Sequence, residues 1–151
     1  MSGGVTPLYD TAQPYQACGM ILRRGTMVAF VLRENVGWMA GYYGLPGGKV
    51  EKDEAASAGA IREAKEEAGV TVKLEDLRAV YTAHRHSEDI DWIDTYFEAS
   101  RWEGEPFNAE PTAHSALEWL NITDLPENII PSVRAALEAI TRGEFYGEIG
   151  W

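Results

Sequence analysis

Apolar residues are concentrated in two short runs near the start of the chain. Residues 15–23 and 27–33 are rich in aliphatic and aromatic side chains, and both have the length of a strand. Arg24, Gly25 and Thr26 stand between them and suit a hairpin turn. The pattern therefore predicts two consecutive strands joined by a tight connection.

The next clear element is a helix. Residues 54–68 contain no proline, are rich in alanine and glutamate, and end at Gly69, a residue type common just past helix C-termini. Asp53 stands where a side chain could cap the helix start. The preceding residues 37–48 hold five glycines and Pro46, and we predict a loop there.

Further strands and a second helix complete the predicted order. The predicted elements are strands at 70–81, 90–99 and 117–120 (the last short and buried), a polar turn at 82–89, a loop at 102–114, and a helix at 131–142 stopped by Gly143. This succession of strands, helix, strands and helix predicts an α/β (or α+β) sandwich with a mixed β-sheet between helices.

Length and composition favour one globular domain. The chain has 151 residues, and we expect a loose lead-in over residues 1–14 and a single domain over residues 15–151. No apolar run is long enough to span a membrane, and the first 14 residues do not resemble a secretory signal. Cys18 is the only cysteine, which excludes an intramolecular disulfide and is typical of a cytoplasmic protein.

The net charge narrows the choice of partners. With 24 acidic and 13 basic residues, the formal charge is −11. Such a surface repels a nucleic-acid backbone, so we expect no nucleic-acid polymer as partner. An anionic phosphate substrate would need divalent cations to bring it in. The alternative is that the charge only keeps the domain soluble, and a homodimer is possible on either interpretation.

Three glutamates of the predicted helix share one face. Glu63, Glu66 and Glu67 fall within an arc of about 100° at helical spacing. Like charges at these separations cost about 0.2–0.5 kcal/mol per pair in an isolated helix, and acidic residues near the C-terminal end oppose the helix dipole. The cluster is therefore either a solvated acidic face or a functional site.

The residues around this helix form a recognisable motif. From Gly48 the sequence reads G-KVEKD-E-AASAGAI-RE-A-K-EE-A-G-V. It resembles the Nudix box, G-x5-E-x7-R-E-U-x-E-E-x-G-U with U aliphatic, although Ala64 is smaller than the usual residue. The match includes every fixed position: Gly48, Glu54, Arg62, Glu63, Glu66, Glu67 and Gly69.

The resemblance extends beyond the box to about residues 15–142. Residues 43–51 are similar to the usual lead-in of the family, and residues 101–106 followed by Glu110 are similar to the MutT-type nucleotide pyrophosphohydrolases. The resemblance implies a Nudix-type α/β/α sandwich and a Mg²⁺-dependent hydrolase for which Mn²⁺ substitutes. Hard Mg²⁺ prefers oxygen ligands, which glutamates on a rigid helix supply.

The resemblance also assigns roles to residues. It implies metal ligation by the carbonyl of Gly47 and by Glu63, Glu66 and Glu67, with Arg62 holding these glutamates in place. Glu54 is expected to orient the ligands rather than bind metal. Two residues compete as general base, Glu67 on the helix and Glu110 in the loop, and Glu110 is also expected as a fourth metal-binding carboxylate; an ordinary loop carboxylate is the alternative for Glu110.

Other candidates lie outside the motif. Arg33 and Lys49 could bind substrate phosphates, or could be ordinary surface residues. His84, His86 and the aspartates between residues 89 and 94 could line the substrate entrance, but a plain surface turn is favoured there because no zinc-ligand spacing is present. Three aromatic residues could stack on a base or belong to the core: Tyr81, Trp92 and Tyr96.

Residues that characterise subgroups of the Nudix family favour one substrate class. The window about 15–18 residues past the box holds Arg85, His86 and Ser87, and so lacks the Pro of the ADP-ribose subgroup and the Tyr of the diadenosine-polyphosphate subgroup. The favoured substrate is a (d)NTP, a class that includes oxidised purines such as 8-oxo-dGTP, and the expected products are NMP and pyrophosphate. The alternatives are a nucleoside diphosphate-sugar or ADP-ribose pyrophosphatase and a non-catalytic nucleotide-sensing module.

Overall fold

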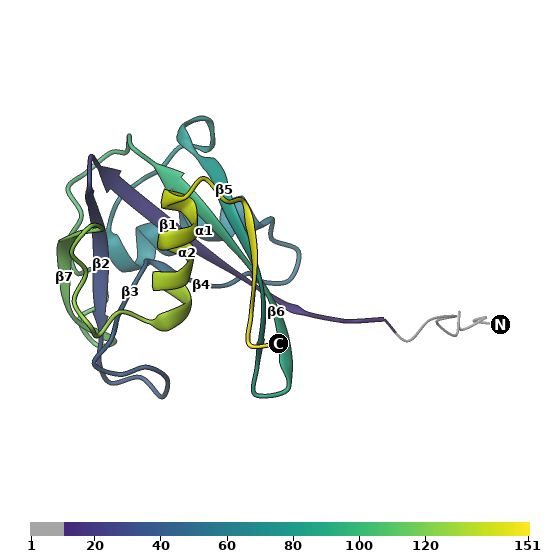
Figure 1. Cartoon of the computed structure of the whole chain (residues 1–151). Helices are drawn as coiled ribbons and strands as arrows, with labels where there is room; N and C mark the ends of the chain where they lie inside the picture. Colours follow the sequence, from purple (N-terminus) through teal and green to yellow (C-terminus); the bar gives the residue numbers. More distant parts are fainter. Residues whose placement is uncertain (1–10) are drawn as a thin grey trace.

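The computed structural model describes residues 11–151 (Figure 1), so most of the lead-in predicted for residues 1–14 lies outside the described residues. Neither α-helix in the described part has the length and hydropathy needed to cross a membrane. The elements in chain order are β1 (Tyr15–Arg24), β2 (Met27–Arg33), β3 (Tyr43–Gly44), β4 (Gly47–Lys49), α1 (Ala56–Ala68), the 3-10 turn η1 (Leu74–Asp76), β5 (Arg78–Ser87), β6 (Ile90–Ala99), β7 (His114–Asn121), α2 (Pro131–Thr141) and β8 (Tyr146–Ile149).

Strand β1 lies at the centre of the sheet. It pairs in parallel with β6 along most of its length, and antiparallel with β4 over residues 17–19 and with β2 at its end. The order across the sheet is β3-β2-β1-β6-β5-β8, with β4 beside β1 and β7 beside β2. Parallel and antiparallel pairs coexist, so the predicted mixed sheet is confirmed.

The two helices cover opposite faces of this sheet. Met20 and Leu22 pack in the cluster that contains α1, whereas Ile21 between them packs in the cluster that contains α2. This alternation arises because successive side chains of a strand point to opposite faces. In Figure 1, α2 lies in front of β1 and α1 lies behind it. The predicted α/β/α sandwich is therefore confirmed.

The predicted helix boundaries need a small correction. Helix α1 begins at Ala56 rather than at residue 54, and no side chain caps its start, so the prediction of a cap by Asp53 is wrong. Asp53 adopts a positive φ of 63°, which places it in the turn before the helix. The carboxylate of Glu54 is also used in that turn, where it accepts a backbone N–H. Helix α2 ends at Thr141, one residue earlier than predicted.

The predicted turn over residues 82–89 is wrong. Residues 70–77 include η1, β5 begins only at Arg78, and that strand continues to Ser87. The connection to β6 is a tight turn in which Glu88 and Asp89 have φ values of 54° and 62°, as hairpin turns of the mirror-image type require. Residues 84–87 are half-buried, a position in which a strand accepts polar side chains. Those polar side chains give the segment the composition of a loop, which is why a turn was predicted.

Three short strands were not predicted. Strand β3 lies inside the predicted loop 37–48 and β4 begins inside it, where the many glycines leave no periodic pattern. Strand β8 adds a parallel partner to β5 after the second helix. Strand β7 begins at His114, inside the predicted loop, and its residues 117–120 are half-buried or exposed rather than buried.

Candidate active site

Helix α1 has an alanine face and a glutamate face. Ala60, Ala64 and Ala68 recur every four residues and are fully buried against the sheet. Their small side chains allow α1 to lie close to the sheet, which brings Glu63 and Glu67 beside β4. The departure of Ala64 from the larger residue usual in the motif is thus a feature of helix packing.

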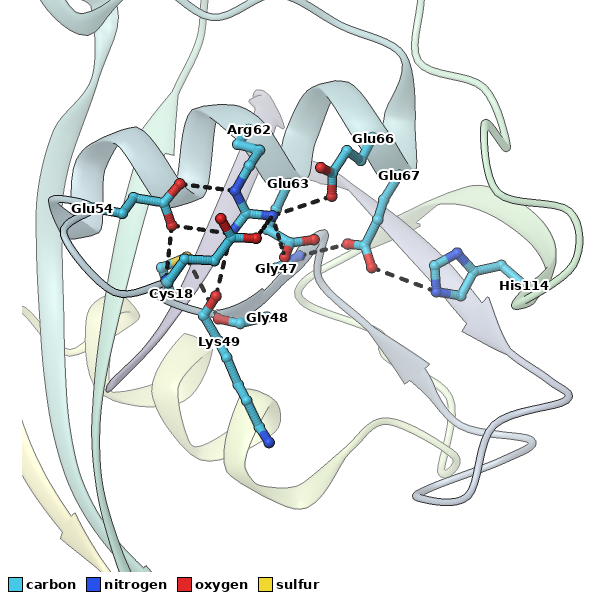
Figure 2. A network of polar contacts seen from close by, with 11 residues as sticks. Cys18, Gly47, Gly48, Lys49, Glu54, Arg62, Glu63, Glu66, Glu67 and His114 are labelled. Carbon is cyan, nitrogen blue, oxygen red and sulfur yellow. Dashed lines mark hydrogen bonds and ion pairs between the residues drawn. The ribbon is translucent and has the colours of Figure 1, made fainter. Parts of the chain in front are cut away.

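Arg62 connects three of the glutamates. Its guanidinium donates to both carboxylate oxygens of Glu54, with Nε 2.8 Å and Nη2 3.0 Å away (Figure 2). Its Nη1 donates to Glu63 at 3.0 Å and to Glu66 at 3.2 Å, and Nη2 also donates to the backbone carbonyl of Lys49. One planar cation therefore fixes the positions of Glu54, Glu63 and Glu66 relative to β4.

These contacts change the acidity of the groups involved. The hydrogen bonds from Arg62, and then that from the Glu51 backbone, lower the pKa of Glu54 to about 2. The same carboxylate raises the pKa of Arg62. Both carboxylate oxygens of Glu54 are therefore occupied by hydrogen bonds from the Arg62 guanidinium.

Two glycines of β4 lie against the helix glutamates. The N–H of Gly47 donates to Oε2 of Glu67 at 2.6 Å. A Cβ on Gly48 would lie 2.7 Å from Oε1 of Glu63, closer than carbon and oxygen atoms can approach without a shift. The carbonyl of Gly47 remains a predicted metal ligand, and the structure places its residue in direct contact with the glutamate cluster.

Glu67 is the buried member of the cluster. Its residue is 7% exposed, and burial raises the pKa of its carboxyl to about 8, with the charges of Glu63 and Glu110 acting in the same direction. Burial also raises the pKa of Glu63, although Arg62 opposes this shift. Two carboxylates are thus held where their ionised forms are poorly stabilised by the protein alone.

The loop before β7 carries Glu110 to the end of α1. The N–H of Phe107 donates to the carbonyl of Ala68 at 3.1 Å, and the N–H of Ala109 donates to the carbonyl of Glu67 at 3.2 Å. Carbonyls of the last helical turn have no partner within the helix, so these bonds dock the loop on the helix end. Ligand atoms of Glu67, Glu110 and His114 consequently lie within 4.8 Å of one another.

The third member of this group, His114, was missed by sequence reasoning. It is 2% exposed, and its Nε2 lies 3.7 Å from Oε1 of Glu67 (Figure 2). Burial, together with the charge of Arg33, lowers the pKa of His114. A lone histidine at the start of a strand has no motif spacing, so only the approach of β7 to α1 reveals it.

The donor set fits a divalent cation. The charge of Glu110 lies close enough to Glu63 and Glu67 to raise the pKa of both. Carboxylate oxygens are the ligands that Mg²⁺ and similar hard cations prefer, and such a cation would offset both the repulsion and the burial. Glu66, half-exposed and held by Arg62, lies on the same helix face within reach of the same cluster.

A cavity of about 400 Å³ opens next to this cluster. Gly47 and Gly48 line it, so it begins where β4 meets the glutamates. Its other walls include aromatic and basic side chains and the buried Asp94. The wall residues with these side chains are Trp38, Trp92, Tyr96, Arg33, Lys49 and Arg85.

The two predicted phosphate ligands both line the cavity. Arg33 donates from Nε to the carbonyl of Trp38 at 3.0 Å, and its guanidinium lies over the indole ring of that residue. The ammonium group of Lys49 lies 5.7 Å from the ring centre of Tyr15 and 5.8 Å from that of Trp92. Figure 2 shows the Lys49 side chain pointing away from α1. Phosphate binding by Arg33 and Lys49 remains a prediction.

The candidates on β5 and β6 separate into two groups. Asp94 forms a forked ion pair with Arg85, at 2.7 and 3.1 Å, in the cavity wall. His84 and His86 instead pack against the ring of Trp151. Tyr81 and Tyr96 are both core residues, and Tyr96 also lines the cavity together with Trp92.

Comparisons with known proteins place this arrangement in a family. The family model of the NUDIX domain matches residues 14–140. The chain belongs to the Nudix family. The 8-oxo-dGTP diphosphatase of Escherichia coli K12 is 31% identical over 116 residues, a match that covers 73% of this chain and 85% of that protein.

Other relatives agree with this assignment. A protein of Mycobacterium tuberculosis is 35% identical over 124 residues, covering 74% of this chain but 56% of the relative, so the match spans little more than half the length of that protein. The crystal structure of a MutT Nudix hydrolase from Burkholderia pseudomallei has a TM-score of 0.76 at 30% identity, and covers 83% of this chain and 97% of the other. The Nudix fold is thereby confirmed.

Proposed function

We propose that this Nudix protein hydrolyses a phosphoanhydride bond of a (deoxy)nucleoside triphosphate, releasing a monophosphate and pyrophosphate. The reaction requires a divalent cation, Mg²⁺ as the proposed ion with Mn²⁺ as a substitute. One observation carries the proposal: a single cavity joins the glycines beside the glutamate cluster to aromatic and basic side chains.

The cavity has the chemistry of a nucleotide site. Arg33, Lys49 and Arg85 supply positive charge in a protein whose net charge is −11. Trp38 and Trp92 supply flat apolar surfaces on which a base can stack. The forked pair of Arg85 and Asp94 presents both donors and acceptors, which the edge of a base can use. These features support a substrate with a base at one end and phosphates at the other.

The glutamate cluster is proposed to hold the cation. Glu63, Glu66, Glu67, Glu110 and the Gly47 carbonyl would supply its oxygen ligands. A bound divalent cation neutralises charge on phosphoryl oxygens and lowers the pKa of water. The fork of Arg62 onto Glu54 keeps the ligand-bearing side chains in position.

Two carboxylates remain candidates for the general base. Glu67 is held by the N–H of Gly47 and is largely shielded from water. Glu110 is half-buried on a docked loop. A positioned carboxylate that accepts a proton from the attacking water contributes about 10²–10⁴-fold to the rate.

The named relatives support the choice of substrate. The Escherichia coli protein is named for the hydrolysis of 8-oxo-dGTP, and an oxidised purine nucleotide is therefore included among the proposed substrates. We also propose that residues 15–151 form a single domain and that the protein acts in the cytoplasm on small molecules rather than on nucleic-acid polymers.

A nucleotide screen tests the proposal. The full chain is incubated with Mg²⁺ and a panel of dNTPs, 8-oxo-dGTP, ADP-ribose and nucleoside diphosphate sugars, and the products are separated by anion exchange. We expect monophosphate and pyrophosphate from one or more triphosphates. Glu67→Gln, purified in the same way, is the control for contaminating phosphatases and should be inactive.

Other outcomes of the screen contradict the proposal in distinct ways. Orthophosphate as the first product would show cleavage at a different anhydride. Activity confined to ADP-ribose or nucleotide sugars would assign the protein to the diphosphate-cleaving class. Binding without turnover across the panel would favour a nucleotide-sensing module.

A further inference from the structure

His114 is held rigidly beside two of the glutamates. Its N–H donates to the carbonyl of Glu110 at 3.0 Å, and its carbonyl accepts from Nδ2 of Asn108 at 2.8 Å. Across the sheet it pairs with Arg33, at the point where the register between β2 and β7 shifts. Such irregularities redirect side chains, and here the imidazole faces α1.

The imidazole of His114 is not fully hydrogen-bonded by the protein around it. Nδ1 of His114 is buried without a hydrogen-bond partner, and among the described residues the only other such side-chain atom is Oδ1 of Asn108. Nε2 lies 3.7 Å from Glu67, too far for a hydrogen bond. Buried ring nitrogens are usually paired, yet Nδ1 has no partner to hold the ring, and Nε2 is the nitrogen that lies beside the carboxylate of Glu67. The orientation of the ring therefore directs Nε2 towards the acidic cluster.

We propose that Nε2 of His114 binds a metal ion together with the carboxylates of Glu67 and Glu110. The three ligand atoms lie within 4.8 Å of one another, so one ion between them can contact all three. The inference rests on the proposed function, because the same cluster would serve the metal-dependent reaction. It adds a nitrogen ligand to a site otherwise built from oxygen.

A nitrogen ligand changes which ions the site prefers. Mg²⁺ favours carboxylates, carbonyls and water, whereas imidazole binds the later first-row transition metals best and Mn²⁺, the first of that series, least strongly. The position formed by Glu67, Glu110 and His114 should therefore favour Co²⁺ strongly, and Mn²⁺ more modestly, over Mg²⁺. Glu63 and Glu66, on the Arg62 side of the helix, offer only oxygen and should show no such preference.

Electron spin-echo spectroscopy of bound Mn²⁺ tests this assignment. The substrate-free full chain receives one equivalent of Mn²⁺, and ¹⁴N coupling from a directly bound imidazole is measured. We expect coupling in the parent protein and none in His114→Asn or His114→Gln. Mn²⁺ affinity should fall about tenfold or more in these variants, since even residues that only support metal ligands change affinity by 10–100-fold. Mg²⁺ affinity should change much less.

His86→Asn is the matched control. Nδ1 of His86 lies 2.8 Å from a carboxylate oxygen of Asp91, so it is also a histidine beside an acid, but on β5 and stacked on Trp151. The ¹⁴N coupling should persist in this variant. A parent protein without ¹⁴N coupling would overturn the inference whatever the variants do, as would coupling that survives in His114→Gln.

The same measurements separate this inference from the proposed function. Hydrolysis of a triphosphate by a protein whose bound Mn²⁺ shows no ¹⁴N coupling would leave the function intact and remove His114 from the site. Coupling that depends on His114, in a protein that hydrolyses nothing on the panel, would establish the metal site and reject the reaction.

Discussion

Glu54 lies in the turn before α1 and Glu67 in the last turn of that helix, and their carboxyl groups respond to the protein in opposite ways. Hydrogen bonds from Arg62 lower the pKa of Glu54 to about 2. Burial raises the pKa of Glu67 to about 8. The two residues have the same chemistry, so the difference comes from what surrounds each carboxylate.

The comparison distinguishes a structural frame, formed by Arg62 and its ion pairs, from the candidate binding site around Glu67. Around Arg62, the carboxylates of Glu54, Glu63 and Glu66 all have the same guanidinium as a partner. Around Glu67, the charges of Glu63 and Glu110 raise the pKa of its carboxyl, and the charge of Arg33 opposes them less strongly. The Arg62 end therefore fixes geometry, and the Glu67 end has the electrostatics of a place that binds a cation.

The largest effect is expected from removing the charge of Glu67. Glu67→Gln should lower kcat by about 10³-fold or more, because a metal ligand or base is lost. The melting temperature of the metal-free protein should stay the same or rise, since glutamine removes a buried carboxyl group whose ionisation is unfavourable. Steady-state kinetics and thermal melts in EDTA measure both effects.

Glu54→Gln is the matched comparison for that variant. It weakens the fork from Arg62, so the metal-free melting temperature should fall while some turnover remains. If Glu67→Gln destabilised the protein as Glu54→Gln does and turned over normally, the distinction between frame and site would be wrong.

The next effect concerns Glu110. Glu110→Gln should lower kcat by about 10²-fold, within the range for loss of a positioned base, with a smaller change in KM because ground-state binding of the nucleotide is retained. Glu105→Gln is the control from the same loop. Its carboxylate pairs with Arg24 in an exposed contact at 2.9 Å, and such pairs contribute little. Parent-like kinetics in both variants would leave Glu67 as the remaining base.

A smaller effect is expected from Arg62→Lys. Lysine keeps the charge but cannot bridge Glu54, Glu63 and Glu66 with one planar group, so kcat should fall by about 10–100-fold, as when residues that orient metal ligands are changed. Arg142→Lys provides the control, because its guanidinium makes the same forked contact to Glu144 on an exposed surface. Equal kinetics for the two lysine variants would show that the Arg62 network does not support the site.

The smallest effect is a pH dependence of stability. In the metal-free protein the raised pKa of Glu67 means that the folded state keeps a proton which the unfolded chain releases above its ordinary pKa of 4.5. The stabilisation is complete below pH 4.5 and is lost as pH rises through about 8. Glu54, with its lowered pKa, acts in the opposite sense and loses its contribution as pH falls below 4.5 towards 2.

Thermal melts in EDTA between pH 5 and 8.5 measure this dependence. The decrease in Tm should be smaller in Glu67→Gln by at least about 2–4 °C, the change that 1 kcal/mol causes in a domain of this size. Saturating Mg²⁺ should reduce the decrease in the parent, because a cation stabilises the ionised carboxylate. Parallel pH profiles for parent and variant would show that Glu67 does not carry the raised pKa.

Local sequence determined much of the fold and the helix-borne part of the candidate site. Strand β6 has the predicted bounds, and α1 ends at the predicted Gly69, because strand-length apolar runs and a C-terminal glycine are local features. The box spacing placed Glu63, Glu66 and Glu67 on one helix face for the same reason. The turn at residues 88–89 was misplaced, since Glu and Asp there do not have the composition of a typical tight turn.

Only the tertiary structure decided which charges have partners. Helical spacing puts Glu66 and Glu67 side by side, yet Glu66 reaches Arg62 and solvent while Glu67 is buried under the docked loop. His114 joins the cluster because β7 pairs with β2 and begins beside the end of α1. Periodicity in the sequence determines which side chains share one face of a helix. Burial of a side chain and the approach of distant segments depend instead on how the elements pack. Burial and neighbouring charges determine the pKa values of the site.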